Sequence, residues 1–230
     1  MSIHKEIPPL LQKPSSLRGQ IVDYMREAIA TGRFMPGQKL VERELCEMLD
    51  ISRTSLREAL RQLEAEKLIT TKLHRGPAVA VITRDEAMDL YAIRALLESY
   101  AVGEFTRKAS DEQVKQLGAE VGNLHVAAAS GDREQLLAAK AKFYDVILEG
   151  CGNQLVKEML LGMLSRINLL RSTSFSQPDR LHESLKEIDQ LFALIAQRDA
   201  AAAHEAARLH IVNAQQAALE VLEKQQHSAN

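Results

Sequence analysis

Hydrophobic positions near the start of the chain recur at the spacing of amphipathic helices, in which apolar residues return every three or four positions. In the first of these segments the apolar residues share one helical face: Leu17, Ile21, Tyr24, Met25, Ala28 and Ile29. Turn-forming glycine and proline residues separate the segments, and Ser52 is a natural N-cap for the last of them. The pattern therefore predicts three helices in succession: 16–31, 42–49 and 53–67.

The pattern then changes to short apolar runs that are typical of β-strands. Two such runs, Leu68–Thr71 and Ala78–Ile82, flank a segment that contains Gly76 and Pro77 and is predicted to form a hairpin turn. Three helices followed by a hairpin within about 70 residues give the outline of a winged helix-turn-helix, in which the hairpin is the wing.

Every later segment combines helical periodicity with helix-start signals. Thr83–Glu86 and Ser110–Gln113 have the form of a capping box, in which two side chains three residues apart each accept a hydrogen bond from the other's backbone amide. About six helices are predicted: 84–109, 111–129, 132–149, 153–172, 178–197 and 199–224. The predicted fold class is mostly α, with an N-terminal winged helix-turn-helix, a small β-hairpin wing and an all-α helical bundle.

Composition narrows the class of protein. The chain of 230 residues is 46% hydrophobic and 26% charged, with 4% aromatic residues and no tryptophan, which counts against all-β architectures and carbohydrate-binding platforms. It has no apolar run of the ~18 residues that a membrane span needs, no signal-peptide pattern, and too few cysteines for a disulfide framework. We therefore expect a cytoplasmic protein without membrane contact, organised as a flexible arm, a winged helix-turn-helix domain and a helical domain: 1–15, 16–82 and 83–225.

The net charge of −2 conceals an uneven distribution. Residues 1–80 hold 13 Lys and Arg against 10 Asp and Glu, whereas residues 81–230 hold 16 against 21. A basic first third on an acidic remainder favours a polyanionic partner for the N-terminal part. Charge also drifts between domains for other reasons, so this asymmetry alone leaves the partner open.

The predicted third helix has the character of a DNA-reading helix, which offers polar side chains from its first turn to the edges of bases. One face is apolar: Leu56, Ala59, Leu60 and Leu63. Arg53 and Arg57 lie outside this apolar face and are four residues apart. The arginine side chain is well shaped for the guanine edge or for a phosphate. The candidates for DNA contact are the following: Arg43, Arg53, Thr54, Arg57, and Arg75 with Gly76 at the wing tip. Any one arginine is equally compatible with a solvated surface, but the arrangement as a whole indicates DNA binding.

Three consecutive motifs resemble the signature of GntR-family bacterial transcription regulators: Gly32–Leu40, Glu42–Leu45 and Ser52–Glu64. The helical remainder resembles the FCD effector domain of the FadR branch, so the resemblance covers about residues 16–213. It implies that the arginines and wing pair named above contact the operator and that a dimer forms largely through the C-terminal domains. One winged helix covers a half-site, so specific binding implies a homodimer on a near-palindromic, double-stranded operator. Two positions depart from the family pattern, because Ser55 replaces a common proline and Lys67 a common glycine.

Helical-wheel positions in the predicted bundle place polar groups on faces that should be apolar. The groups that share these faces are Arg94, Lys140 with Tyr144 beside it, Arg171 and His210. Unpaired buried charge is expensive, so such groups call for an anion or water. Ion pairs between helices, long side chains reaching solvent at the edge of the core, and an ordinary core histidine remain open alternatives.

The resemblance also bears on metal binding. Many FCD domains hold a divalent metal with an Asp-x-x-x-His pair and two later histidines, and the matching positions here are Lys140, Tyr144, Ile188 and His210. One ligand of this set survives, so we expect no metal and no other cofactor. Lys140 could supply the missing positive charge, with Arg94 and Arg171 as forks for carboxylate or phosphate oxygens. The expected effector is a small organic acid or a phosphorylated metabolite. A long-chain acyl-CoA and a relic pocket without an effector are the alternatives.

An enzyme is the rival class. The chain contains no Gly-x-Ser-x-Gly, no phosphate-binding glycine loop, no histidine pair with metal-ligand spacing and no plausible Cys–His arrangement. Catalysis would also leave the arginine-bearing motif unexplained. We therefore expect a regulator rather than an enzyme, with repression relieved by a metabolite as the family default.

Overall fold

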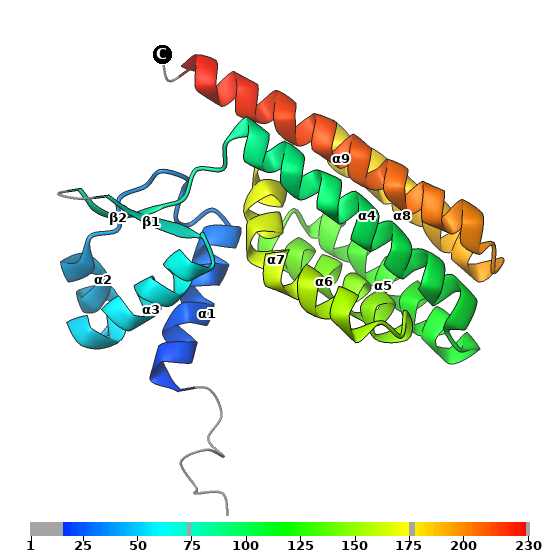
Figure 1. The fold of residues 1–230 in the computed structure, drawn as a ribbon, viewed down its shortest axis with the longest axis horizontal. Helices are drawn as coiled ribbons and strands as arrows, with labels where there is room; N and C mark the ends of the chain where they lie inside the picture. Colours follow the sequence, from blue (N-terminus) through cyan, green and yellow to red (C-terminus); the bar gives the residue numbers. More distant parts are fainter. Residues whose placement is uncertain (1–15, 73–74, 175–177, 229–230) are drawn as a thin grey trace, which may run out of the picture. The chain divides into compact units, whose positions relative to one another are not determined.

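The computed structural model describes residues 16–72, 75–174 and 178–228 (Figure 1). The predicted arm over 1–15 lies outside these residues. The chain divides into two compact units, Met1–Ala80 and Val81–Asn230. Among the described residues, no helix combines the length and the apolar character required to span a bilayer.

The described residues of the first unit form three helices and a two-stranded sheet: α1 (Leu17–Ala30), α2 (Glu42–Leu49), α3 (Arg53–Ala65), β1 (Ile69–Lys72) and β2 (Gly76–Val79). The strands pair antiparallel, with Ile69 opposite Val79. The predicted winged helix-turn-helix is confirmed, with one correction. The second strand begins at Gly76 and ends at Val79, whereas the prediction ran from Ala78 to Ile82, because the pairing register and not hydrophobicity sets its limits.

Local capping interactions fix the ends of the helices in this unit. The Ser52 hydroxyl accepts a hydrogen bond from the Ser55 amide at 3.1 Å and caps α3 as predicted. After α3, Lys67 has a φ of 59°, so the lysine that departs from the family pattern adopts the left-handed conformation that glycine prefers. The apolar faces of α1 and α3 meet in a core whose centre holds Met25, Leu56 and Leu63.

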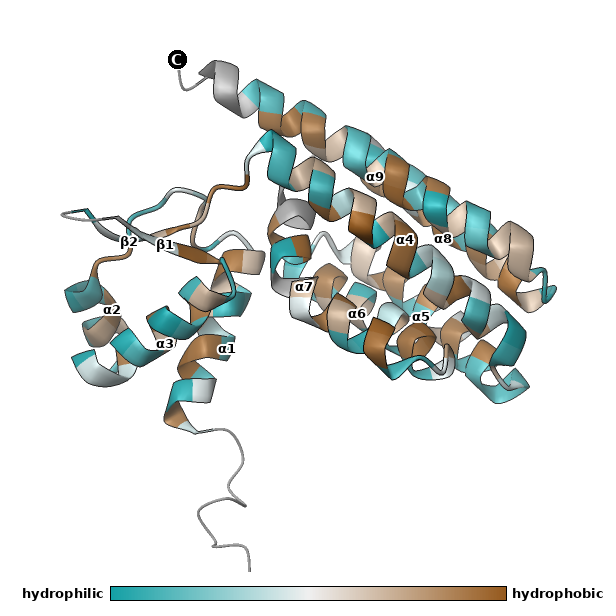
Figure 2. Ribbon diagram, in the orientation of Figure 1, coloured by the Kyte–Doolittle hydropathy of each residue, from teal (hydrophilic) through white to brown (hydrophobic). Residues whose placement is uncertain are grey.

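The second unit is a bundle of α-helices: α4 (Arg84–Lys108), α5 (Asp111–Ser130), α6 (Arg133–Gly150), α7 (Gln154–Ser174), α8 (Pro178–Ala196) and α9 (Ala200–Ser228). The capping boxes predicted at Thr83 and Ser110 are both present. Helix α9 runs along α4, and α5 lies beside α6 (Figure 1). Apolar and hydrophilic residues alternate along these helices, as amphipathic bundle helices require (Figure 2).

The core of the bundle is not purely apolar. Around a centre that includes Phe105, Phe143 and Leu117, several charged or polar residues are also buried: Arg94, Glu98, Ser99, Thr106, Lys140, Ser184 and His210. Buried charge is rare in proteins unless it is paired or has a functional use. These buried polar and charged residues therefore mark the part of the bundle where a ligand site is expected.

Candidate DNA-binding and effector sites

The first turn of α3 presents the predicted DNA-contacting residues to solvent. Arg53, Thr54 and Arg57 are all exposed, while Leu56 and Leu60 on the same helix are buried. The helix thus has the division into a packed face and a polar face that base reading requires. The structure brings these three residues together, as the sequence predicted, and Arg43 is exposed on α2 in the same unit.

Two of the candidate arginines are oriented by carboxylates of α2. Arg57 Nε donates to both oxygens of Glu42, at 3.1 and 3.0 Å, which joins α2 to α3. Arg43 approaches Glu47 more loosely, at 3.5 Å and with both side chains exposed. Sequence reasoning missed Glu42, because a contact across the turn between two helices has no fixed spacing along the chain.

The wing tip owes its shape to Gly76, whose φ of +75° is unfavourable for a residue with a side chain. Arg75 precedes it and is exposed. Leu73 and His74, also at the predicted tip, lie outside the described residues. A short hairpin end of this kind can bring its backbone and one arginine against a phosphate or into a minor groove.

In the second unit, Arg94 of α4 is 2% exposed and lies inside the bundle as predicted. Its Nε donates to Glu98 Oε1 at 2.7 Å, and its guanidinium carbon lies 4.8 Å from the centre of the Tyr91 ring. Burial opposes the charge, but nearby Glu98, with smaller contributions from Tyr91 and Tyr144, leaves the pKa of Arg94 above its ordinary value. Arg94 is therefore charged, and its first partner is a carboxylate of its own helix.

His210 of α9 is 3% exposed and is held by a carboxylate from another helix. Its Nδ1 lies 2.5 Å from Glu187 Oε2 of α8, and Arg180 and Asn213 donate to the same carboxylate. Burial, with nearby Lys140 also contributing, lowers the pKa of His210 to about 4 despite Glu187. Although partial burial opposes it, the hydrogen bonds from His210, Arg180 and Asn213 lower the pKa of Glu187 to about 2. Near neutral pH the pair is thus an uncharged imidazole on an ionised carboxylate.

Lys140 and Tyr144 lie one turn apart on α6. Lys140 is 5% exposed, and its charge acts on His210, while Tyr144 is half-buried and acts on Arg94. The side chain of Arg171, the remaining predicted effector residue, lies outside the described residues. Arg94, Lys140 and His210 are thus buried, and Tyr144 is close enough to Arg94 to act on its charge.

The partners Glu98 and Glu187 were missed by sequence reasoning. Glu98 follows Arg94 by four residues, a spacing that favours a helical ion pair and could have revealed it. Glu187 carries no such signal, because it meets His210 only once α8 and α9 pack together. One alternative left open by the sequence is therefore realised, a hydrogen-bonded core histidine for His210. The ion pair of Arg94 lies within α4 and is not the pair between helices that was considered.

A small cavity of about 30 Å³ lies between α4, α6 and α7, with Glu98, the partner of Arg94, in its wall. Three polar side chains, Glu98, Tyr144 and Asp145, lie in its wall. The rest of the described lining is apolar: Ala141, Leu148, Leu160, Leu161 and Ile167. The cavity thus joins polar to apolar side chains, and its volume is that of about one water molecule.

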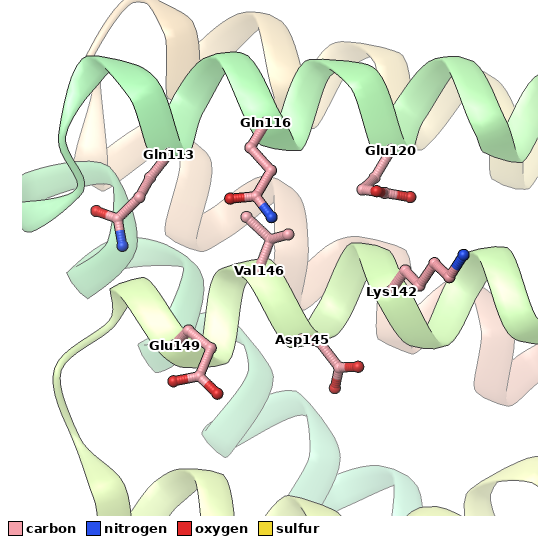
Figure 3. Close-up of a pocket in the computed structure, with 7 residues that line it drawn as sticks. All are labelled: Gln113, Gln116, Glu120, Lys142, Asp145, Val146 and Glu149. Carbon is pink, nitrogen blue, oxygen red and sulfur yellow. The ribbon is translucent and has the colours of Figure 1, made fainter.

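A second, larger cleft of about 350 Å³ lies between α5 and α6. Figure 3 shows Gln113, Gln116 and Glu120 of α5 above the side chains of α6. Those α6 residues include two further acids, Asp145 and Glu149, and a single base, Lys142. Burial raises the pKa of Asp145. The excess of carboxylates makes this cleft unfavourable for an anion, so it is not the anion site that the sequence predicted.

The four positions that match the family's metal ligands do not suit a divalent cation. Lys140 is itself a cation, Tyr144 is a weak ligand at neutral pH, and Ile188 has no donor atom. His210 already uses Nδ1 toward Glu187, with Arg180 on the same carboxylate. Within the described residues, no three Asp, Glu, His or Cys side chains are grouped so that they could hold a metal ion.

Comparison with known proteins agrees with this geometry. The family described as bacterial regulatory proteins, gntR family, matches residues 17–79, and the FCD domain matches residues 89–213, more than half of the chain. This chain belongs to the GntR family. It is therefore a transcription regulator with an N-terminal DNA-binding part and a C-terminal FCD domain, in a family of regulators and not of enzymes.

Relatives that match most of the chain are described as HTH-type transcription regulators. The HTH-type transcriptional repressor GlaR of Escherichia coli K12 is 28% identical over 198 residues, which cover 82% of this chain and 90% of GlaR. The HTH-type regulator YdhC of Bacillus subtilis 168 is 24% identical over 203 residues, 88% of this chain and 89% of YdhC. A GntR regulator structure from Rhodococcus sp. RHA1 superposes with a TM-score of 0.77 at 21% identity, over 90% of this chain and 99% of that one. The last comparison supports the fold.

Proposed function

We propose that this GntR-family regulator is a repressor that binds a near-palindromic operator as a homodimer. A small anionic metabolite, bound in the helical unit without a metal ion, changes its operator affinity. The observation that carries the proposal is the burial, within one bundle, of cationic or titratable side chains from three helices: Arg94, Lys140 and His210. Such a grouping is expensive to fold unless an anion offsets it. The repressor role is carried over from the name of GlaR.

Operator binding would use the exposed polar face of the first unit. Arg53 and Arg57 would reach base edges or phosphates from α3, with Thr54 between them and Arg43 on α2. Arg75 and Gly76 would contact the backbone or the minor groove from the wing. The side chains of Arg43, Arg53, Thr54, Arg57 and Arg75 are exposed, which supports their assignment to DNA contact.

The homodimer would form through an apolar face of the helical unit. Large apolar side chains on α4 and at the start of α7 are between 39% and 67% exposed: Ile93, Leu96, Tyr100, Leu155 and Met159. Those on α4 recur at helical spacing. Asn153, the residue before α7, donates to the Tyr100 hydroxyl at 3.2 Å, so the two groups are neighbours. Apolar residues gathered on one face support a protein–protein interface there.

The effector would be held at the buried cations. Lys140, buried on α6 and close enough to act on His210, would provide the positive charge that a metal provides in other members of the family. A carboxylate or phosphate oxygen near Lys140 and Arg94 would gain charge-assisted hydrogen bonds, and Tyr144 would add a neutral one. Because the metal-ligand set is replaced by Lys140, Tyr144 and Ile188, no step of this binding uses a metal.

Ligand binding could act on DNA binding through α4. This helix begins at Arg84, shortly after β2 ends at Val79, and it carries Arg94 in its third turn. An anion that binds one arrangement of α4 more tightly than another shifts the protein toward that arrangement. The two winged units of the dimer would then match the half-sites better or worse.

Two experiments test the proposal. Native mass spectrometry of the purified protein should show a dimer with no zinc or nickel, and a retained organic acid would be weighed directly; a stoichiometric metal would contradict the metal-free site. The second compares Lys140→Met with Lys142→Met, which removes an exposed lysine from the same helix. Organic acids should shift operator affinity in the Lys142 variant as in the wild type, and the Lys140 variant should not respond. A full response by the Lys140 variant would refute its role.

The rival effector models give different results. A long-chain acyl-CoA would appear in the mass spectrum as a large adduct. A relic pocket would leave operator affinity insensitive to every acid, since Glu98 and Glu187 would simply be permanent partners of Arg94 and His210.

A further inference from the structure

The second strand of the wing has backbone partners on both of its sides. On one side β2 pairs with β1, and on the other side hydrogen bonds join it to the segment 37–40, which precedes α2. The Val79 amide donates to the Gln38 carbonyl at 2.9 Å, and the Leu40 amide donates to the Pro77 carbonyl at 2.9 Å. Among the described residues β2 is therefore the central strand of the wing, and β1 lies at its edge.

Thr71 of β1 directs its backbone amide away from β2. Its partner in the register is Pro77, which has no amide hydrogen and whose carbonyl accepts from Leu40 on the other side. Alternate residues of an antiparallel pair turn both backbone groups away from the partner strand, and Thr71 holds such a position. An amide that points outward at the edge of a sheet needs an acceptor from another part of the protein or from water.

Glu64 of α3 provides this acceptor. Its Oε1 accepts a hydrogen bond from the Thr71 amide at 2.9 Å. Glu64 follows Arg57 by seven residues and Arg53 by eleven, about two and three helical turns, so it lies on the same side of α3 as these arginines. A carboxylate on the side assigned to DNA contact is unfavourable near a polyanion. Its contact with β1 gives a reason for its presence there.

The contact lies close to the tip of the wing. Thr71 immediately precedes Lys72, which pairs with Gly76 at the start of β2, and the exposed Arg75 precedes that glycine. A short two-stranded hairpin is only marginally stable by itself, so the direction of its tip depends on contacts with the rest of the domain. The hydrogen bond from Thr71 to Glu64 therefore ties the tip end of β1 to α3.

We propose that Glu64 is a positioning residue for operator binding. Its carboxylate holds the wing in one position relative to α3, so that Arg75 at the wing tip and the α3 arginines meet the same duplex together. The inference rests on the proposed function, which places both groups on the operator, and it adds a residue that acts through the wing. Without this contact the wing would be ordered only when DNA binds, which costs affinity.

A matched pair of variants separates this role from the charge of Glu64. Glu64→Gln removes the negative charge but keeps a side-chain oxygen that can accept from the Thr71 amide. Glu64→Met has a similar length and helix propensity but only a weak acceptor. Glu64→Ala replaces the methionine variant should that one fold poorly. Fluorescence anisotropy with an operator selected in vitro gives the affinity of each variant, with and without Arg75→Ala, and urea denaturation shows whether each is folded.

Glu64→Gln should bind the operator as tightly as the wild type or more tightly, because a lost negative charge favours phosphate approach. Glu64→Met should bind about three- to tenfold more weakly than Glu64→Gln. In chains that also carry Arg75→Ala the two variants should bind alike, because a wing without its arginine gains little from being held in place. A purely structural role of Glu64 would instead weaken binding equally with and without Arg75.

Two results would overturn the inference: equal operator affinity of the folded Gln and Met variants, or the same difference between them with and without Arg75. The Arg75→Ala chain alone separates this failure from that of the proposed function. If it binds more weakly than the wild type while the two Glu64 variants bind alike, the wing contacts DNA but Glu64 does not position it. If Arg75→Ala leaves operator affinity unchanged, the proposed wing contact fails and the inference fails with it.

Discussion

Glu42, the first residue of α2, accepts hydrogen bonds from Nε of Arg57 on α3 with both of its carboxylate oxygens, at 3.1 and 3.0 Å. Within the described part of the chain, this contact engages only the inner nitrogen of the guanidinium. The outer fork can still make the two parallel hydrogen bonds that arginine forms with guanine or phosphate. The carboxylate therefore orients a DNA-reading arginine before DNA arrives.

The first prediction concerns this orientation. Glu42→Ala should weaken operator binding about two- to fivefold, because a partly exposed ion pair contributes modestly and Arg57 would lose its fixed direction. Glu44→Ala removes the same charge two residues further along the first turn of α2 and is the control. It should leave binding unchanged or strengthen it, since a lost negative charge favours phosphate approach. Fluorescence anisotropy with an operator selected in vitro measures the affinity of both variants. Equal effects of the two changes would contradict the orienting role of Glu42.

The second prediction concerns base reading by α3. Arg53→Ala and Arg57→Ala should each lose about 1–3 kcal/mol of specific operator binding if the contact is a bidentate base contact. Arg61→Ala, an exposed arginine two turns beyond Arg53, should cost much less. Titrations against operator and random DNA separate specific from general binding. The assignment is wrong if the three variants discriminate operator from random DNA as well as the wild type does.

The third prediction concerns the dimer. Leu96, 67% exposed on α4, lies at the centre of the proposed apolar face. Leu96→Asp should place a charge in the interface and give monomers, with a corresponding loss of operator affinity. Val126→Asp, at a position 70% exposed on α5, introduces the same charge elsewhere and should remain dimeric. Light scattering coupled to gel filtration gives the mass of each, and a dimeric Leu96 variant would exclude this face.

The fourth prediction is a pH dependence of stability from His210. Its pKa falls from the model-compound value of 6.5 to about 4 in the folded protein, so the unfolded chain binds the proton more readily. Stability is therefore lost as pH falls through this interval, by about 2 kcal/mol between pH 7 and pH 5. Glu187, whose pKa is lowered to about 2, adds a further loss only between about pH 4.5 and pH 2.

Urea denaturation at several pH values measures how the free energy of unfolding depends on His210. His210→Gln should be less stable than the wild type at pH 7 and should lack most of the loss between pH 7 and pH 5. His182→Gln, which removes an exposed histidine, should keep the wild-type dependence. A parallel decline in the wild type and the His210 variant would show that His210 does not titrate as described.

The sequence predicts the elements of this protein well, because periodicity and capping are local properties. The bounds of α2 agree at both ends, Ser52 caps α3, and the burial of Arg94, Lys140 and His210 follows from helical spacing alone. The partners of these residues were not predicted. Glu98 required attention to a four-residue spacing, whereas Glu42 and Glu187 come from other helices, and only tertiary packing places them.

The hairpin shows the same limit in another form. Hydrophobicity continues through Val81 and Ile82, yet β2 ends at Val79, opposite Ile69, and the Ala80 amide donates one further backbone hydrogen bond to the Leu68 carbonyl at 2.9 Å. Ile82 is buried without being in a strand, so the apolar character of residues 81 and 82 does not mean that they belong to the sheet.

The most direct test of the account is operator affinity measured against increasing organic acid, in the presence of a chelator, for the wild type and for Arg94→Gln/Glu98→Gln. The double variant removes both members of the buried pair and leaves no uncompensated charge. The account predicts that the acid changes the affinity of the wild type, while the double variant binds the same operator with similar affinity and does not respond. Equal responses from the two proteins, or a wild-type response that the chelator abolishes, would contradict it.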